Sequence, residues 1–189
     1  MAFFTSAEMA ALRQPFRPIF ELLIGSGMRL GEAESLRVCD LRLGDHENRA
    51  LIEDSKTVSG RRAAYLPIWV ARALAEHVED RGLTGTDRLF SIPRRTVQKE
   101  HRRACKIAGI HDYTIHDHRH TAAVHLARVG LPLQLLQRQL GHATISQTMR
   151  YADFHPRYSD VGAYFAKVEE SFGLGETPHF SPHPEKASD

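Results

Sequence analysis

Apolar residues recur at helical spacing along most of the chain. Within residues 68–81, Val70, Leu74 and Val78 lie four residues apart and form one apolar stripe, which Gly82 ends. Similar patterns, separated by glycines and prolines, predict most of the remaining structure to be helical. The predicted helices cover residues 16–24, 28–36, 93–108, 116–129, 131–140 and 156–172, and a further one opens at 143–144 and delivers Tyr151.

The spacing changes between residues 49 and 68. The segments Ala50–Glu53 and Ala63–Pro67 predict two strands around a polar turn over 55–60. We expect a small antiparallel sheet near residues 40–68, with a third strand if residues 41–43 join it. The predicted fold class is therefore α+β, mostly α-helical with one small antiparallel sheet.

Length and composition are those of one globular domain. At 189 residues, with 42% hydrophobic and 25% charged residues, the chain can bury one core. Cys39 and Cys105 fit neither a metal-binding spacing nor a disulfide framework, which favours a reducing compartment. No apolar run approaches the roughly 20 residues that span a bilayer, and no signal-peptide pattern opens the chain. We therefore expect a soluble cytoplasmic protein with no membrane partner.

Net charge alone does not indicate a nucleic-acid-binding protein, because +2 is only mildly basic. The local distribution is more informative, since residues 94–106 contain six basic residues and one glutamate. Arg95, Lys99, Arg102 and Lys106 repeat at helical spacing and form one basic stripe. In most proteins such a stripe is an ordinary solvated helix face, but this concentration of charge predicts contacts with phosphate.

The segment from His116 to Tyr151 carries residues suited to chemistry on a phosphodiester. That chemistry needs a nucleophile, proton-transfer groups and fixed positive charge around the phosphate oxygens. Metal ions often supply the charge, but no acidic cluster has a metal-binding spacing, and His116 and His120 lack a third ligand. Arg119 lies between these histidines and would repel a cation. Arginine can replace the metal, because its guanidinium donates two hydrogen bonds to phosphate, so we expect no metal and no cofactor.

Four segments carry a recurring pattern of such residues. They are residues 27–36 around Arg29, Ser55-Lys56-Thr57 followed by Arg61-Arg62, His116-Asp117-His118-Arg119-His120-Thr121, and Leu140-Gly141-His142 followed by Thr148 and Tyr151. Together they resemble the tyrosine recombinase (phage integrase) family, over about residues 5–172. The resemblance implies the catalytic-domain fold of that family and a site-specific recombinase or integrase. Such an enzyme cleaves and rejoins DNA through a 3′-phosphotyrosyl intermediate without metal or ATP.

The resemblance also implies roles for single residues. Arg29 and Arg119 would hold the nonbridging oxygens of the scissile phosphate, and His142 would donate a further hydrogen bond to it. Tyr151 would attack phosphorus to give the 3′-phosphotyrosyl linkage. Lys56 would protonate the departing 5′ oxygen.

Three further residues complete this set of expectations. His116 would assist proton transfer at the tyrosine. Arg61 and Arg62, next to the hairpin turn, are expected to bind DNA together with the basic stripe. Either of them is also an alternative to Lys56 as the cation that approaches the phosphate.

Some positions have a simpler structural explanation or depart from the family pattern. Taken alone, Arg29 could pair with Glu32 and have no catalytic role. His118 stands where the family usually has an apolar residue, so it must be hydrogen-bonded if it faces the core. Asp117 and His120 are expected to make structural hydrogen bonds around the start of their helix.

The domain prediction is a catalytic domain over residues 1–172 followed by a flexible tail over 173–189. The N-terminal DNA-binding domain that family members normally have is expected to be absent, because Arg29 lies so near the first residue. The expected partner is double-stranded DNA, bound by a homotetramer, with a monomer as the alternative for the domain alone. The alternative functions are a type IB topoisomerase, a non-catalytic DNA-binding regulator derived from an integrase, and a metal-dependent nuclease.

Overall fold

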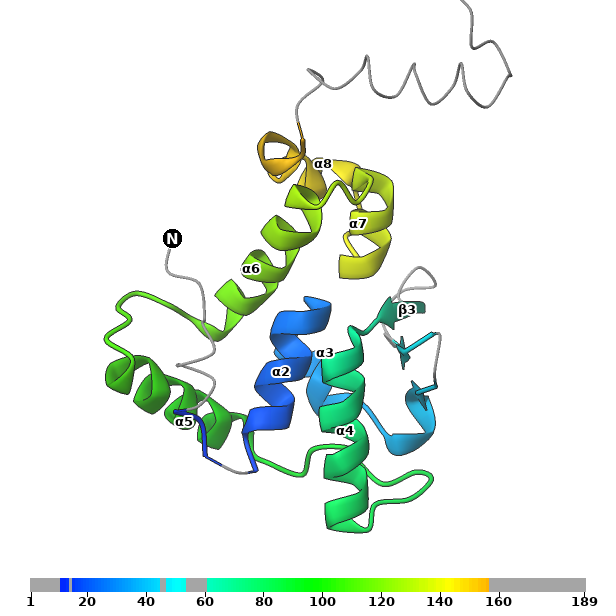
Figure 1. The fold of residues 1–189 in the computed structure, drawn as a ribbon, viewed down its shortest axis with the longest axis vertical. Helices are drawn as coiled ribbons and strands as arrows, with labels where there is room; N and C mark the ends of the chain where they lie inside the picture. Colours follow the sequence, from blue (N-terminus) through cyan, green and yellow to red (C-terminus); the bar gives the residue numbers. More distant parts are fainter. Residues whose placement is uncertain (1–10, 14, 45–46, 54–60, 157–189) are drawn as a thin grey trace, which may run out of the picture. The chain divides into compact units, whose positions relative to one another are not determined.

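Helix α2 (Arg17–Ser26) lies at the centre of the fold, and most of its side chains are buried. Gly27 ends the helix in the left-handed conformation, with φ of 70°. The helix contacts both α4 (Ile68–Arg81) and α6 (Ile115–Arg128), and it lies between them in Figure 1. The prediction of this helix is confirmed, although it ends two residues later than expected.

The computed structural model describes residues 11–13, 15–44, 47–53 and 61–156, and the described residues up to His155 belong to one unit. Some predictions fall outside this part of the chain. They concern Lys56, the helix over 156–172 apart from Pro156, and the tail over 173–189. None of the described helices is long and apolar enough to cross a membrane.

The predicted sheet is present. Strands β1 (Leu41–Arg42), β2 (Arg49–Ile52) and β3 (Arg62–Tyr65) pair antiparallel in the order β1-β2-β3. In this register Ala50 of β2 lies opposite Ala64 of β3, and both side chains are fully buried. The third strand joins as anticipated, because β1 pairs with the other edge of β2.

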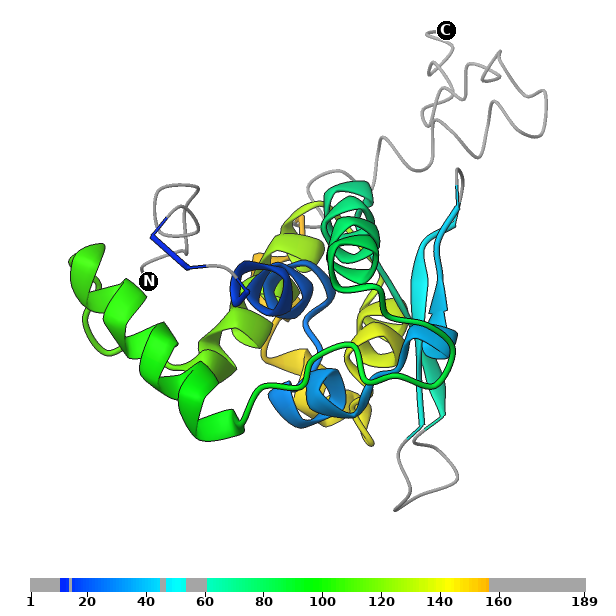
Figure 2. The same cartoon turned by 90° about the horizontal axis from the view of Figure 1, so that it is seen from below.

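The remaining described helices occupy the segments predicted for them, so the α+β class is confirmed. They are α3 (Leu30–Ser35), α5 (Arg94–Ile107), α7 (Leu133–Leu140) and α8 (Ile145–Met149), with short 3-10 turns η1 (Val38–Asp40) and η3 (Ala152–Phe154). Figure 1 and Figure 2 both place α5 and the sheet on opposite sides of α2. Helix α7 contacts β3 and α8, which places the end of α7 near the sheet.

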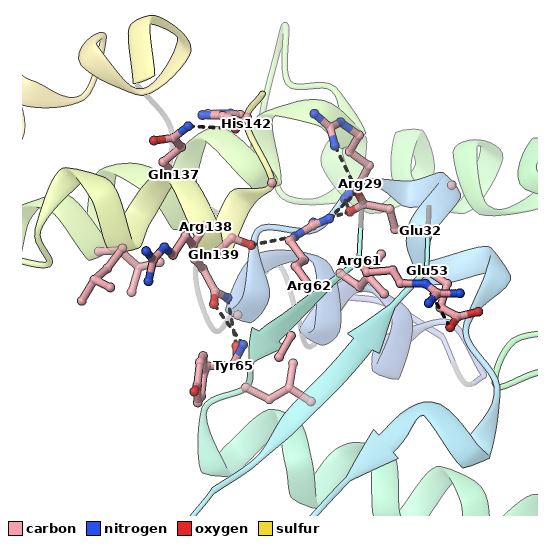
Figure 3. A pocket seen from close by; sticks show the side chains of 18 of the residues that line it. Arg29, Glu32, Glu53, Arg61, Arg62, Tyr65, Gln137, Arg138, Gln139 and His142 are labelled. Carbon is pink, nitrogen blue, oxygen red and sulfur yellow. Dashed lines mark hydrogen bonds and ion pairs between the residues drawn. The ribbon is translucent and has the colours of Figure 1, made fainter. Parts of the chain in front are cut away.

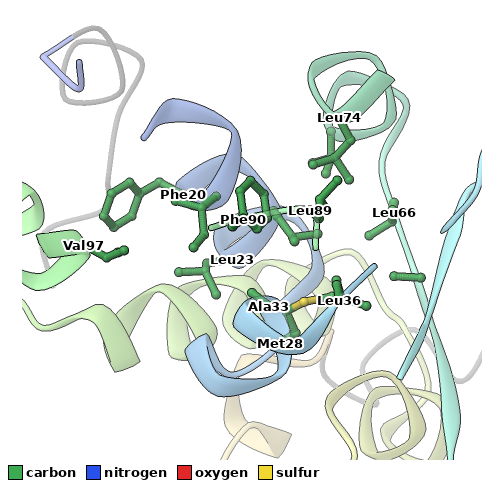
Figure 4. Packing of buried hydrophobic residues seen from close by; sticks show 14 of the residues in the cluster. Phe20, Leu23, Met28, Ala33, Leu36, Leu66, Leu74, Leu89, Phe90 and Val97 are labelled. Atoms are coloured by element: carbon green, nitrogen blue, oxygen red, sulfur yellow. The ribbon is translucent and has the colours of Figure 1, made fainter. Parts of the chain in front are cut away.

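Two clusters of buried apolar side chains hold these elements together. The larger cluster includes Phe20, Leu23 and Leu74 and lies around α2 (Figure 4). The smaller cluster joins α6 and α7 and includes Leu136 and Tyr151. Burial of each large apolar side chain stabilises the fold by roughly 1.5–3 kcal/mol. The predicted nucleophile, Tyr151, is therefore also a packing residue of the smaller cluster.

His118 is fully buried, at 0% exposure. The hydroxyl of Tyr113 lies 3.4 Å from its Nδ1, and the rings of Phe20, His101 and Tyr113 surround it at centroid distances of 5.6, 5.1 and 5.1 Å. Burial lowers the pKa of His118 to about 3 and that of His101 to about 4. Both rings are therefore neutral at physiological pH and pack as aromatic groups. The expected hydrogen bond to His118 is the one from Tyr113.

These two histidines make the fold sensitive to acid. Because their pKa values are lower in the folded chain than the ordinary 6.5, the stability they contribute is complete above about pH 6.5. It is lost as the pH falls from there towards 4 and then 3, and we expect a loss of a few kcal/mol. Urea unfolding across this pH range measures the effect.

A matched pair of variants identifies the source of this sensitivity. We expect His118→Leu to flatten the pH dependence, because leucine fills the site without a titrating group. His125→Leu, an exposed position on the same helix, should leave the dependence unchanged. Equal pH profiles for His118→Leu and the unmodified chain would rule out this explanation.

Candidate active site

Arg29 lies between α2 and α3, where the glycine turn brings it out of the core. Its backbone N–H donates to Oε2 of Glu32 at 2.7 Å, and its Nη1 donates to Oε1 of the same carboxylate at 3.0 Å. The simple ion pair that the sequence allowed for Arg29 is thus present. The Arg29 side chain is nevertheless 45% exposed, so much of its guanidinium remains accessible to a ligand.

Arg119 is the buried counterpart of Arg29. It is only 3% exposed, and its Nη1 donates to the carbonyl oxygen of Gly27 at 2.8 Å. Its Nη2 is buried without a hydrogen-bond partner among the described residues. Burial, followed by the charge of Arg29, lowers the pKa of Arg119 to about 10, so it stays charged at physiological pH. A buried charged donor without a partner is costly unless an anion completes it.

Arg29, Arg94, His116 and Arg119 border one hollow of about 200 Å3. They come from the turn before α3, the start of α5 and the first turns of α6. Arg94 is partly engaged, because it forms an ion pair with Glu34. No acidic side chain of the described segments borders the hollow. Its donors and positive charge suit a phosphate group.

His142 follows the end of α7, where Gly141 is in the left-handed conformation with φ of 66°. Its Nδ1 lies 2.9 Å from Oγ1 of Thr148, which fixes the ring against α8. Burial, with the nearby charges of Arg119 and Arg29, lowers the pKa of His142 to about 4. The ring is therefore neutral at physiological pH, and its second nitrogen, Nε2, is left for another contact.

Tyr151 is only 3% exposed, and its hydroxyl lies 3.1 Å from Nδ1 of His120. The ring of His142 is nearly parallel to that of Tyr151, at 7° and a centroid distance of 6.4 Å. Burial raises the pKa of Tyr151, and the charges of Arg150 and Arg119 act in the opposite direction. The hydroxyl is therefore protonated at physiological pH.

Glu32 connects the two sides of the site, because it accepts hydrogen bonds from Arg62 of β3 as well as from Arg29. Nη1 and Nη2 of Arg62 lie 3.0 and 2.9 Å from Oε1 and Oε2 of Glu32, and its Nε donates to the carbonyl oxygen of Gln139 at 3.2 Å (Figure 3). The guanidinium lies so close to Gly141 that an added Cβ there would be 2.6 Å from it. Arg62 therefore connects α3, the sheet and the turn that carries His142.

The protonation state of Glu32 follows from these partners. Burial alone would raise its pKa, but the hydrogen bond and charge of Arg62, with those of Arg29, lower the pKa below its usual value. The carboxylate is thus charged at physiological pH. We call the arrangement of Glu32, Arg62 and Gly141 the Glu32 brace.

The predicted DNA-binding residues differ in their exposure and in their ion pairs. Arg61 is 77% exposed and has one weak ion pair with Glu53 at 3.7 Å, whereas Arg62 is 11% exposed and its donors face the brace. The stripe on α5 is exposed and makes no ion pair with any residue that the structure describes. It consists of Arg95, Lys99, Arg102 and Lys106.

Sequence reasoning missed the partner of the tyrosine. Asp117 caps the start of α6 as expected, since its Oδ2 accepts from the backbone N–H of Thr114 at 2.6 Å. His120 instead reaches the Tyr151 hydroxyl, 31 residues further along the chain, so the prediction of a bond near the helix start was wrong for it. No local pattern indicates such a contact. Among the described residues, no group of three histidines, cysteines or carboxylates could hold a metal ion.

Comparison with known proteins identifies the family of the chain. The model of the Phage integrase family matches residues 3–157. The chain belongs to the phage integrase family. The match covers every predicted catalytic position, from Arg29 to Tyr151, including Lys56.

Relatives and solved structures of the phage integrase family support the assignment. The chain is 32% identical over 155 residues to the tyrosine recombinase XerC of Pelobacter propionicus and 37% identical over 150 residues to that of Rhodospirillum centenum. These matches cover 78% and 72% of the chain but 49% and 42% of the relatives, so the chain spans about half of their length.

Two solved structures have the same fold. XerH site-specific recombinase bound to palindromic difH substrate superposes with a TM-score of 0.66 at 24% identity, over 92% of this chain and 48% of that one. The catalytic domain of bacteriophage HP1 integrase gives 0.63 at 24% identity, over 87% and 95%. The fold is that of tyrosine recombinase catalytic domains.

The Glu32 brace predicts a large difference between two neighbouring arginines. We expect Arg62→Met to lower the free energy of unfolding by about 3 kcal/mol, because it removes one partner of an ion pair that is only 11% exposed on each side. Arg61→Met, one residue earlier and exposed, should change it by less than about 0.5 kcal/mol. Urea unfolding at neutral pH measures both variants, and similar losses would contradict the brace.

Proposed function

We propose that this chain is the catalytic domain of a site-specific tyrosine recombinase, which cleaves and rejoins double-stranded DNA through a 3′-phosphotyrosyl intermediate. The observation that carries the proposal is the buried guanidinium of Arg119, whose Nη2 has no partner among the described residues. It borders, with Arg29, a hollow lined by donors rather than acceptors. The XerC relatives are tyrosine recombinases, and the XerH structure is a complex with its substrate.

In this proposal the scissile phosphate occupies the hollow beside Arg29 and Arg119. Two guanidinium groups would hold its nonbridging oxygens and offset the charge that develops as a nucleophile approaches phosphorus. His142 would donate a further hydrogen bond from Nε2, because Thr148 engages its Nδ1. The arginines supply the fixed charge, so the scheme uses no metal and no other cofactor.

Tyr151 would be the nucleophile. Its Oη–phosphorus bond forms as the bond from phosphorus to the 5′ oxygen breaks. Lys56 would protonate the departing 5′ oxygen, and His116, at the rim of the hollow, would assist proton transfer at the tyrosine. The phosphotyrosine retains the energy of the phosphodiester, so a 5′-hydroxyl of another strand can reverse the step without ATP.

The remaining parts of the proposal concern extent and partners. The catalytic domain comprises residues 1–172, followed by a tail over 173–189. Its partner is double-stranded DNA, on which four copies assemble, and the working compartment is the cytoplasm. The exposed basic stripe on α5, together with Arg61, would bind the DNA backbone.

Trapping of a covalent protein–DNA adduct tests the proposed chemistry. We expect the full chain, incubated in EDTA with a pool of nicked duplexes of randomised sequence, to form an adduct that resists SDS. Tyr151→Phe should abolish the adduct, because it lacks the nucleophilic hydroxyl but keeps the ring that fills the smaller cluster. Sequencing of the captured DNA then identifies the preferred site.

The other outcomes separate the alternatives. DNA binding without any adduct would favour a non-catalytic regulator, and DNA cleavage that forms no adduct and that EDTA abolishes would favour a metal-dependent nuclease. Relaxation of supercoiled plasmids without sequence preference would favour a type IB topoisomerase.

The basic stripe predicts the salt dependence of DNA binding. Changing Arg95, Lys99, Arg102 and Lys106 to glutamine should weaken binding to a mixed-sequence duplex. If each residue neutralises one phosphate, the slope of log affinity against log salt should become shallower by about 1 for each. Arg72→Gln with Arg81→Gln, on exposed positions of α4, is the control and should leave the slope unchanged. Equal slopes for both variants would exclude the stripe as a DNA contact. Fluorescence anisotropy across a salt series measures this.

A further inference from the structure

The hydroxyl of Tyr151 lies within hydrogen-bond distance of the ring of His120, and Arg150 also acts on this hydroxyl as a hydrogen-bond donor. The distance from Oη to Nδ1 is 3.1 Å, and the ring centroids are 5.2 Å apart. This distance is within the range that direct proton transfer requires. His120 follows Arg119 directly on α6, so the phosphate-binding arginine and the partner of the nucleophile are held by one turn of helix.

Both members of the pair are neutral at physiological pH. Burial, together with the charge of Arg150, lowers the pKa of His120 below its ordinary value, so its ring is neutral at physiological pH. Burial raises the pKa of Tyr151. The tautomer of His120 then sets the direction, and with the ring proton on Nε2 the tyrosine donates to Nδ1.

Other titratable groups around His120 are less suited to accept this proton. On α6, His116 is exposed at the rim of the hollow, and the carboxylate of Asp117 accepts from Thr114. From the segment after α8, Arg150 is a cation and cannot accept. His142 is turned parallel to the tyrosine ring, with its Nδ1 engaged by Thr148.

We infer that His120 itself takes the proton of Tyr151 when the hydroxyl attacks the scissile phosphate, which leaves His116 an assisting role at the rim of the hollow. This inference rests on the proposed function. The O–H bond of Tyr151 breaks and its proton moves to Nδ1 of His120, while Oη bonds to phosphorus and the 5′ oxygen leaves with a proton from Lys56. In the reverse step His120 returns the proton to the tyrosine.

Proton transfer in this pair must accompany bond formation to phosphorus. In the free protein Tyr151 does not transfer its proton to His120, because the pKa of the tyrosine is raised and that of the histidine is lowered. As Oη bonds to phosphorus its proton becomes acidic, and the imidazolium that forms lies near the anionic phosphate. The acceptor is thus needed in the transition state, where general bases typically contribute 10²–10⁴-fold.

The test uses the full chain and the duplex captured by the adduct experiment. His120→Asn keeps an oxygen near the position of Nδ1 and so keeps the hydrogen bond, but it cannot take a proton. We expect adduct formation to slow by about 10²-fold. The unmodified chain should lose rate as the pH falls through the pKa of His120, and the variant should lack this acid limb. His125→Asn, the same change at an exposed position of α6, is the matched control.

A second substrate distinguishes deprotonation of Tyr151 from protonation of the leaving 5′ oxygen. If sulfur replaces the 5′ oxygen at the scissile bond, the leaving group needs no proton, so Lys56→Met should recover its rate. His120→Asn should remain slow on this substrate. An unchanged rate and pH profile in His120→Asn, or an acid limb removed only by His116→Asn, would overturn the inference.

Failure of the proposed function can be distinguished from failure of the role of His120. If the unmodified chain forms no adduct on any duplex, the recombinase proposal fails, and the inference fails with it. Nuclear magnetic resonance of 13Cζ-labelled tyrosine then reports whether the contact itself exists, because His120→Phe should shift the Tyr151 resonance, whereas His125→Asn should not.

Discussion

A largely buried carboxylate between two arginines is the interaction on which the rest of the site depends. Without Glu32, the guanidinium groups of Arg29 and Arg62 would repel each other in a poorly solvated groove. With it, they can approach the same point from α3 and from β3. Because Arg62 also contacts the end of α7, the position of His142 depends on the same carboxylate. Strand β3 thereby helps to position Arg29 and the turn that carries His142.

The brace also explains how charge is divided within the site. Glu32 shares its two oxygens between Arg29 and Arg62, and no acidic group of the described residues reaches Nη2 of Arg119. Positive charge is thus retained at Arg119, beside the proposed phosphate site. It is neutralised at Arg62, where β3 packs against α3 and α7. A net charge of +2 for the whole chain conceals this separation. The proposed function depends on Nη2 of Arg119, which has no partner among the described residues, and only the folded chain reveals that.

The sequence predicted the elements better than the contacts between them. Helix α4 was predicted with its observed bounds, because an apolar stripe and a terminal glycine are local signals. The sheet was likewise found from a local change in spacing. The Glu32–Arg62 pair spans 30 residues and the His120–Tyr151 pair spans 31, and periodicity carries no information about such pairs. The family resemblance marked candidate positions, but it did not indicate that Arg62 faces inward or that His120 meets the tyrosine.

Tyr151 has two requirements that oppose each other. As a member of the cluster between α6 and α7, it stabilises the fold through burial. The same burial raises its pKa and so makes the hydroxyl a poorer nucleophile. A cation nearby reduces this penalty, and Arg119 and Arg150 both act on the hydroxyl in that sense. Cations alone cannot remove the proton, so a buried tyrosine that attacks phosphorus needs an acceptor beside its hydroxyl. His120 meets that condition because it lies on the helix against which the tyrosine packs.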